Sequence, residues 1–185
     1  MKNRPALPTA NVRPHEITLH GHTRVDEYYW LRDKNNPEVI EYLDAENDYT
    51  KQMTAHLEGF QKKLYDEMVG RMQETDSTAP VRVGDFYYYS RTEKGKQYSI
   101  HCRKAGSVEA EEEVLLDLNN LAVGHDYFRL GVFRVSPDQR LLAYSLDTVG
   151  AEDYTIQFKD LSTGEILPDR IKGTAYSAAW AEDNE

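Results

Sequence analysis

A strand–turn–strand segment at residues 133–145 restricts the possible folds of this chain more strongly than any other part of the sequence. Two strand-like runs flank a Ser-Pro-Asp turn, in which Pro137 presets the turn dihedral angle and Asp138 can accept hydrogen bonds from the backbone. The segment Ala179–Asp183 stands where a second copy of residues 134–138 would fall, roughly 45 residues later, which is typical of propeller blades. The recurrence predicts a repeated four-stranded sheet, the building unit of a β-propeller.

Several short β-branched and aromatic runs resemble this segment, and turn residues bound them. They are Val81–Arg91, Gln97–Lys104, Glu113–Leu118 and Tyr154–Asp160, with a hairpin turn at Glu93–Lys96 and a turn into a fourth strand at 161–165. A weaker sequence similarity relates residues 86–90 to residues 141–145. Residues 76–185 are therefore interpreted as the first two to three blades of a propeller. Because propellers have about four to eight blades and the sequence ends just after a new turn, we expect a truncated chain.

Residues 1–75 have a different character and predict a helical N-terminal arm, which makes the fold class mainly β with this arm in front. Prolines precede an alternating run at 15–20, so we expect an extended stretch with a short strand. The aromatic cluster at 26–33 is expected to pack, because it would otherwise leave an exposed apolar patch.

A helix is predicted to begin at Pro37, because Asn36 can cap it and proline at the first helical position sacrifices no hydrogen bond. Apolar residues then recur at spacings of three and four as far as Met72, which indicates one apolar stripe. We expect Gly59 to divide this stretch into two helices.

The charge of the chain excludes some partners. A formal net charge of -10 argues against binding to nucleic acid, which requires clustered Lys and Arg. No apolar stretch has the length of a signal peptide or a membrane span, so a cytoplasmic location without membrane contact is predicted. The acidic run Glu109–Glu113 is expected to form an exposed loop, and the single cysteine, Cys102, to be a structural thiol in a reducing compartment.

The search for reactive residues predicts no catalytic, cofactor-binding or metal-binding position. A Gly-x-Ser-x-Gly elbow is missing from the sequence, and Gly106-Ser107-Val108 is interpreted as a turn. His20 and His22 could bind a metal together, but no third ligand has a convincing spacing. Structural or surface roles are favoured for the other candidates, which are the histidines His15, His56, His101 and His125, the acidic pair Asp26-Glu27 and the loop Asp147–Asp153.

The chain resembles the oligopeptidase B branch of the prolyl oligopeptidase family of serine peptidases, of which it would be the N-terminal quarter. The segments that carry the resemblance are His20–Asp33, Asn36–Ile40, Tyr42–Asn47, Lys63–Arg71, Gly95–Tyr98 and Val135–Asp138. At Gln139 many blade turns have Gly or Asn, and this difference is interpreted as a minor variation.

The resemblance implies an arm that packs on a C-terminal α/β-hydrolase domain, and a seven-bladed propeller that covers the active site and filters substrates by size. It also implies cleavage of short peptides after Arg or Lys. The catalytic triad of the family lies in the C-terminal domain, outside this sequence, so the chain alone is expected to be inactive. The alternative is a stand-alone propeller-like module that binds a protein partner.

Overall fold

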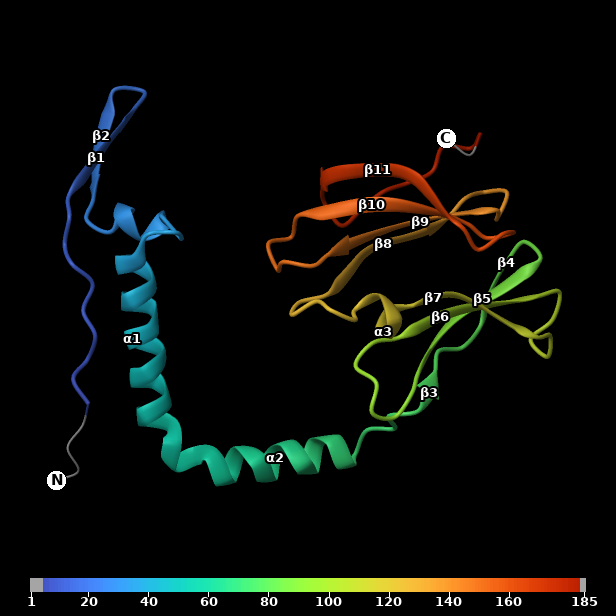
Figure 1. The fold of residues 1–185 in the computed structure, drawn as a ribbon, viewed down its shortest axis with the longest axis horizontal. Helices are drawn as coiled ribbons and strands as arrows, with labels where there is room; N and C mark the ends of the chain where they lie inside the picture. Colours follow the sequence, from blue (N-terminus) through green and yellow to red (C-terminus); the bar gives the residue numbers. More distant parts are fainter. Residues whose placement is uncertain (1–4, 184–185) are drawn as a thin grey trace. The chain divides into compact units, whose positions relative to one another are not determined.

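A computed structural model describes residues 5–183 of the chain. The chain divides into two compact units, Met1–Met72 and Gln73–Glu185, which are coloured blue to blue-green and green to red in Figure 1. The first unit combines a hairpin with helices, and the second contains two antiparallel sheets. We describe each unit by itself.

The extended arm of the first unit ends in a β-hairpin. Strand β1 (His15–Leu19) pairs with β2 (His22–Asp26), and the turn between them places His20 at φ 50° and Gly21 at φ 79°. The strand expected at 15–20 is therefore confirmed, but its partner was not predicted. The sequence of β2 alternates only weakly, with four of its five residues exposed, so no buried face marks it as a strand.

The aromatic cluster packs against the arm, as predicted, from a short 3-10 helix, η1 (Tyr29–Arg32). The Trp30 indole N–H donates to the carbonyl oxygen of Asn11 at 2.9 Å, and the Arg13 guanidinium lies 4.6 Å from the centre of the Trp30 ring. His15 stacks on Tyr29 with ring centres 4.0 Å apart. These contacts hold the arm next to η1 through aromatic and cation–π interactions.

Two helices follow, α1 (Pro37–Thr54) and α2 (Glu58–Gly70), joined by the 3-10 helix η2 (Ala55–Leu57). The predicted cap is confirmed, because the Asn36 side chain accepts a hydrogen bond from the Glu38 N–H at 3.0 Å. The expectation of two helices is confirmed, but their division does not occur at Gly59, which lies inside the first turn of α2. The break follows Thr54, whose hydroxyl donates to the Thr50 carbonyl, a contact that often bends helices.

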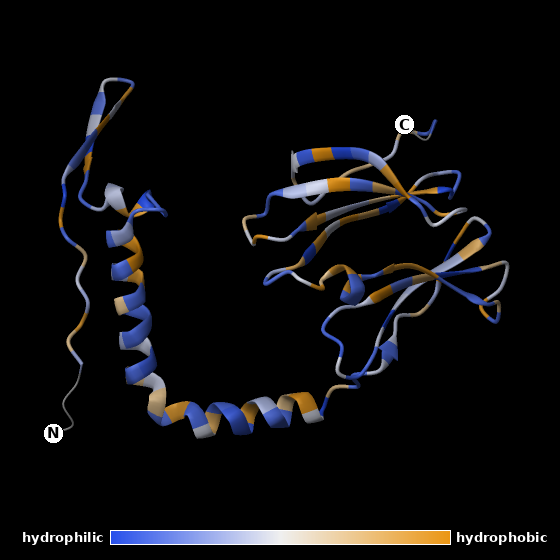
Figure 2. Ribbon diagram, in the orientation of Figure 1, coloured by the Kyte–Doolittle hydropathy of each residue, from blue (hydrophilic) through white to orange (hydrophobic). Residues whose placement is uncertain are grey.

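The predicted apolar stripe runs along both helices, where hydrophobic positions recur among hydrophilic ones (Figure 2). Most of its side chains are solvent-exposed in the described structure, and they include Leu43, Leu57, Phe60, Leu64, Met68 and Met72. Only Val39 of α1 is buried. Helices of this kind usually gain their stability by burying such a stripe against another surface.

The first sheet of the second unit contains β3 (Asp76–Ser77), β4 (Val81–Val83), β5 (Phe86–Thr92), β6 (Ile100–Ala105) and β7 (Glu112–Asp117). Both β3 and β4 pair antiparallel with β5, so together they form one interrupted strand beside it. Pro80 lies in the interruption, where its missing N–H removes a hydrogen-bond donor. The run predicted at Val81–Arg91 is two strands, because the chain turns at Gly84, with φ 58°.

The second sheet has the order β11-β10-β9-β8 and consists of β8 (Arg129–Val135), β9 (Leu141–Asp147), β10 (Tyr154–Asp160) and β11 (Ile166–Thr174). The predicted tight turn joins β8 to β9, and the Ser136 hydroxyl there accepts a hydrogen bond from the Leu141 N–H at 2.9 Å. Strands β5 and β9 occupy the same place in their sheets. The weak sequence similarity between them therefore reflects equivalent positions.

The two sheets lie face to face (Figure 1) and share one hydrophobic core. A short helix, α3 (Leu118–Leu121), connects β7 with the second sheet and contributes Leu118 to this core. The buried members of the core are Leu115, Leu116, Leu118, Phe128, Leu142, Tyr144 and Leu161. They come from both sheets and from the connections, so neither sheet buries its apolar face alone.

Candidate functional site

A buried arginine crosses the interface between the two sheets of the second unit, which we call the seam. Arg103 of β6 is only 5% exposed, and its Nε and Nη2 donate to the Glu113 carboxylate at 2.6 and 3.0 Å. Its Nη1 donates to the carbonyl oxygen of Gln139 in the other sheet at 2.8 Å. The guanidinium also lies over the Phe86 ring, 4.0 Å from its centre. Arg103 therefore uses its planar fork to join two sheets.

A lysine makes a second polar link across the seam. Lys159 of β10 donates from Nζ to the carbonyl oxygen of Leu115 in β7 at 2.8 Å. Burial lowers the pKa of the Lys159 ammonium below its ordinary value, because the charged form loses hydration. Because the ammonium donates to a backbone carbonyl of the other sheet, we assign this residue a structural role.

An aromatic pair forms a contact across the seam between β6 of the first sheet and β8 of the second. His101 stacks on Phe133 with ring centres 4.6 Å apart. Burial lowers the pKa of the His101 imidazole below its ordinary value. The neutral ring is therefore the form that the folded seam favours.

Acidification is expected to destabilise the second unit through His101. Stability should be retained above the pKa of an unfolded histidine, about 6.5, and should fall as the pH drops from there through the lowered pKa of the folded state. A His101→Phe variant keeps the stack but removes the titration, so urea midpoints measured between pH 7.5 and 5 should fall less steeply. His125→Phe, at an exposed position, is the control and should keep the original slope. Equal slopes for all three proteins would contradict this expectation.

A cleft of about 510 Å³ opens at the end of the seam where β4 and β8 end. Its walls are formed by Val83, Tyr88, Phe133, Arg134, Val135, Ser136, Pro137, Gln139, Ala179 and Trp180. The Trp180 indole N–H donates to the Arg134 carbonyl at 2.9 Å, and its ring packs edge-on against Phe158. The segment predicted to repeat 134–138 thus lies against the second sheet near that first copy.

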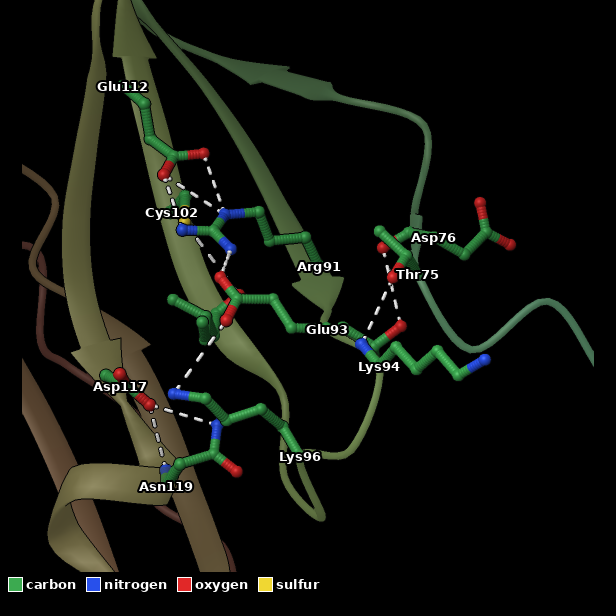
Figure 3. Close-up of polar contacts among 12 residues, drawn as sticks. Thr75, Asp76, Arg91, Glu93, Lys94, Lys96, Cys102, Glu112, Asp117 and Asn119 are labelled. Carbon is green, nitrogen blue, oxygen red and sulfur yellow. Dashed lines mark hydrogen bonds and ion pairs between the residues drawn. The ribbon is translucent and has the colours of Figure 1, made fainter.

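The opposite face of the first sheet carries a polar network, shown in Figure 3. Arg91 of β5 donates from Nε and Nη2 to the Glu112 carboxylate at 3.0–3.1 Å, and from Nη1 to Glu93. The Tyr89 hydroxyl also donates to Glu112. The Arg91 guanidinium holds the pKa of the Glu112 carboxyl below its ordinary value.

This network corrects one expectation from the sequence. The acidic run Glu109–Glu113 was predicted to be an exposed loop, but Glu112 and Glu113 lie in β7 and are partly buried, whereas the strand predicted at Glu113–Leu118 is largely confirmed. Their carboxylates face opposite sides of the sheet and pair with Arg91 and Arg103. On the neighbouring strand β6, Arg103 stands directly opposite Glu113 and Lys104 opposite Glu112, so opposite charges face each other across the two strands.

Cys102 lies beneath the network and is only 1% exposed. Burial raises the pKa of its thiol to about 11. A thiol of this kind stays protonated near neutral pH and is a poor nucleophile. With Arg91 occupied by two carboxylates, the arrangement can hold the sheet together but offers no group for covalent chemistry.

The other candidates from the sequence are not brought together. His20 lies in the turn of the first hairpin and His22 begins β2, and no group of three or more His, Cys, Asp or Glu suited to a metal occurs among residues 5–183. The Ser107 hydroxyl donates to Glu109 in an exposed turn. Asp147 is fully buried, and its carboxylate accepts from the N–H groups of Val149, Gly150 and Glu152, each at 2.9 Å. That carboxylate organises the loop Asp147–Asp153.

Sequence reasoning missed the polar links across the seam. Arg103 and Gln139 stand 36 residues apart, and Lys159 and Leu115 stand 44 apart. The only available signal was the alternation of β6, which places His101 and Arg103 on one face and Cys102 on the other. That pattern identifies a buried arginine only once the partner sheet is known.

The stacked antiparallel sheets, with the repeated strand–turn–strand hairpin at equivalent places, define consecutive blades of a β-propeller. Residues 8–185 match the family described as "Prolyl oligopeptidase, N-terminal beta-propeller domain". The chain belongs to this family. The resemblance found in the sequence is thereby confirmed.

Curated relatives and solved structures agree with this assignment. The chain is 42% identical to dipeptidyl aminopeptidase BI of Pseudoxanthomonas mexicana over 95% of its own length, and 44% identical to protease 2 of Moraxella lacunata over 89%. It is similar to oligopeptidase B from Leishmania major, with a TM-score of 0.84 and 31% identity over 95% of the chain. The corresponding values for oligopeptidase B from Trypanosoma brucei are 0.81, 33% and 94%.

The chain spans only about a quarter of the length of these proteins, namely 27% and 25% of the two curated relatives and 28% and 27% of the two solved structures. Among residues 5–183, no helix is both long enough and apolar enough to cross a bilayer.

Proposed function

We propose that this chain supplies the N-terminal arm and the first blades of a propeller that covers the active site of a serine oligopeptidase. The observation that carries the proposal is the pair of blades stacked on one shared core, within a chain that matches a peptidase propeller domain over residues 8–185. Stacked blades form a rigid wall around a channel, and such a wall excludes folded proteins by size. This function needs no reactive side chain in the blades.

The complete enzyme would cleave short peptides after Arg or Lys in the cytoplasm, with its triad in a C-terminal α/β-hydrolase domain. We assign no catalytic, cofactor-binding or metal-binding residue to this chain. Residues 1–75 would form the arm and 76–185 the start of the propeller. Support for this division comes from the exposed apolar stripe of α1 and α2, which is suited to cover another domain of the same protein.

The nucleotide sequence downstream of the codon for Glu185 tests the enzymatic part of the proposal. We expect an open reading frame that encodes further blades and then a Gly-x-Ser-x-Gly elbow, followed by an aspartate and a histidine. A stop codon directly after Glu185 would instead favour the alternative, a stand-alone binding module. Without the downstream domain the enzymatic assignment would then fail.

The rate of hydrolysis should depend on the charge of the residue before the cleaved bond if the proposal is correct. The complete protein should hydrolyse a peptide amide after Arg or Lys at least about a hundredfold faster than the matched norleucine peptide, because a site built for a charged group rejects an uncharged analogue. Residues 1–185 alone should show no hydrolysis above a buffer blank. Equal rates for the Arg and norleucine peptides would contradict the proposed specificity, and activity of residues 1–185 would contradict the absence of a catalytic group.

A further inference from the structure

Gln139 adopts a backbone conformation that normally selects glycine. Its φ is 63°, in the left-handed region, at the last position of the tight turn between β8 and β9. This conformation costs a non-glycine residue free energy, and among other residues Asn and Asp tolerate it best. The turn alone therefore gives no reason for a glutamine, and the interpretation of Gln139 as a minor variation overlooks this cost.

The Gln139 side chain reaches into the neighbouring blade and uses both ends of its amide. Its Nε2 donates to the carbonyl oxygen of Val83, the last residue of β4, at 3.0 Å. Its Oε1 accepts from the Tyr88 hydroxyl of β5 at 3.2 Å. Both partners belong to the first sheet, more than fifty positions earlier in the chain. The amide thus bridges two strands of one blade from the turn of the next.

The first blade is shaped to receive this amide. Gly84 follows Val83 in the turn between β4 and β5, and a Cβ added there would lie 2.1 Å from Gln139 Nε2. A side chain at position 84 would therefore displace the amide. The turn between β4 and β5 thus has no side chain at Gly84, and the side chain of Gln139 from the turn between β8 and β9 occupies the space that this leaves.

We propose that Gln139 is a clasp that holds the first two blades together at the end of their seam where β4 and β8 end. The bridge from its amide to Val83 and Tyr88 outweighs the cost of its left-handed backbone. The backbone carbonyl of Gln139 binds Arg103 independently, so substitution of the side chain leaves that contact in place. The inference concerns the blades themselves and does not depend on any peptidase activity.

A Gln139→Gly variant tests the clasp, because a simple turn residue and a clasp predict opposite changes in the thermal midpoint. Glycine relieves the left-handed backbone, so it should raise the thermal midpoint if Gln139 is only a turn residue. If the amide is a clasp, the midpoint of the full chain should fall by about 4 °C, and hydrogen exchange in residues 81–88 should accelerate about tenfold. Gln139→Asn tolerates the same backbone but is too short to bridge, so it should also lower the midpoint. An unchanged or higher midpoint in Gln139→Gly overturns the proposal.

A second comparison isolates the fit between the two turns. Gly84→Ala and Gly95→Ala both introduce a side chain at positive φ, but only the Cβ at position 84 has a neighbour within 4 Å. Gly84→Ala should therefore lower the midpoint more than Gly95→Ala does, and this excess should vanish in the Gln139→Gly background. An excess that persists there would show that the amide is not what Gly84 accommodates, and the clasp would be rejected.

Discussion

Replacing Leu142 by alanine is expected to lower the free energy of unfolding of the second unit by about 3 kcal/mol, within the range measured for buried leucines. Leu142 is 0% exposed and lies in the core that both sheets share. Its truncation removes buried methyl groups and leaves a cavity between rigid sheets, which close such a gap only partly. Urea denaturation followed by tyrosine and tryptophan fluorescence measures the change.

The control for Leu142→Ala is Val149→Ala, at a position that is 72% exposed in the loop after β9. Its effect should stay within about 0.5 kcal/mol, as for most surface substitutions. Two separate transitions in Leu142→Ala, or a loss below about 1 kcal/mol, would indicate that the two blades do not depend on a common core.

An Arg103→Met substitution is expected to cost about 2–3 kcal/mol. The methionine approximates the length of the arginine stem, but it removes the hydrogen bond to the Gln139 carbonyl and leaves the Glu113 carboxylate unpaired. The Glu113 side chain is 41% exposed, so water can hydrate it in part, and the loss should be smaller than for a fully buried pair. The same urea titration gives the value.

Arg134→Met is the matched control for Arg103→Met, because Arg134 is exposed on β8 and forms no ion pair with a carboxylate among residues 5–183. A double-mutant cycle with Glu113→Gln then separates the ion pair from the contact to Gln139. The expectation would be refuted if Arg103→Met cost no more than Arg134→Met.

Local signals in the sequence were sufficient for the elements whose causes are local. The turn at Pro137 and Asp138 and the helix cap at Asn36 each depend on residues within a few positions, and both were predicted correctly. Strand β10 also followed from its alternation and β-branched content, and β9 from its place after the tight turn. In these cases propensity and tertiary structure favour the same result.

The incorrect predictions concern residues whose structure depends on contacts with residues that are not their neighbours in the sequence. Gly59 looked like a helix breaker, yet an isolated glycine costs a helix only about 1 kcal/mol, and the chain broke beside Thr54 instead. Glu112 lies in a strand, where it stands opposite Lys104 of β6 and forms an ion pair with Arg91 of β5, and no local pattern indicates either partner. The importance of Gln139 was invisible for the same reason, since Val83 is 56 positions away.

Both sheets connect their strands in sequence order, each with the strand just before or after it, apart from the shared place of β3 and β4. Contacts of this kind close short loops, and their entropic cost is small compared with that of distant pairing. During synthesis, which adds about 5–20 residues per second, each blade can complete its ladder before the next has left the ribosome. Its apolar face, however, stays uncovered until the following blade arrives, because the core belongs to two sheets. We therefore expect the nascent chain to pass through a stage in which the first sheet is complete but its apolar face is exposed to water. A chaperone would bind the chain at this stage.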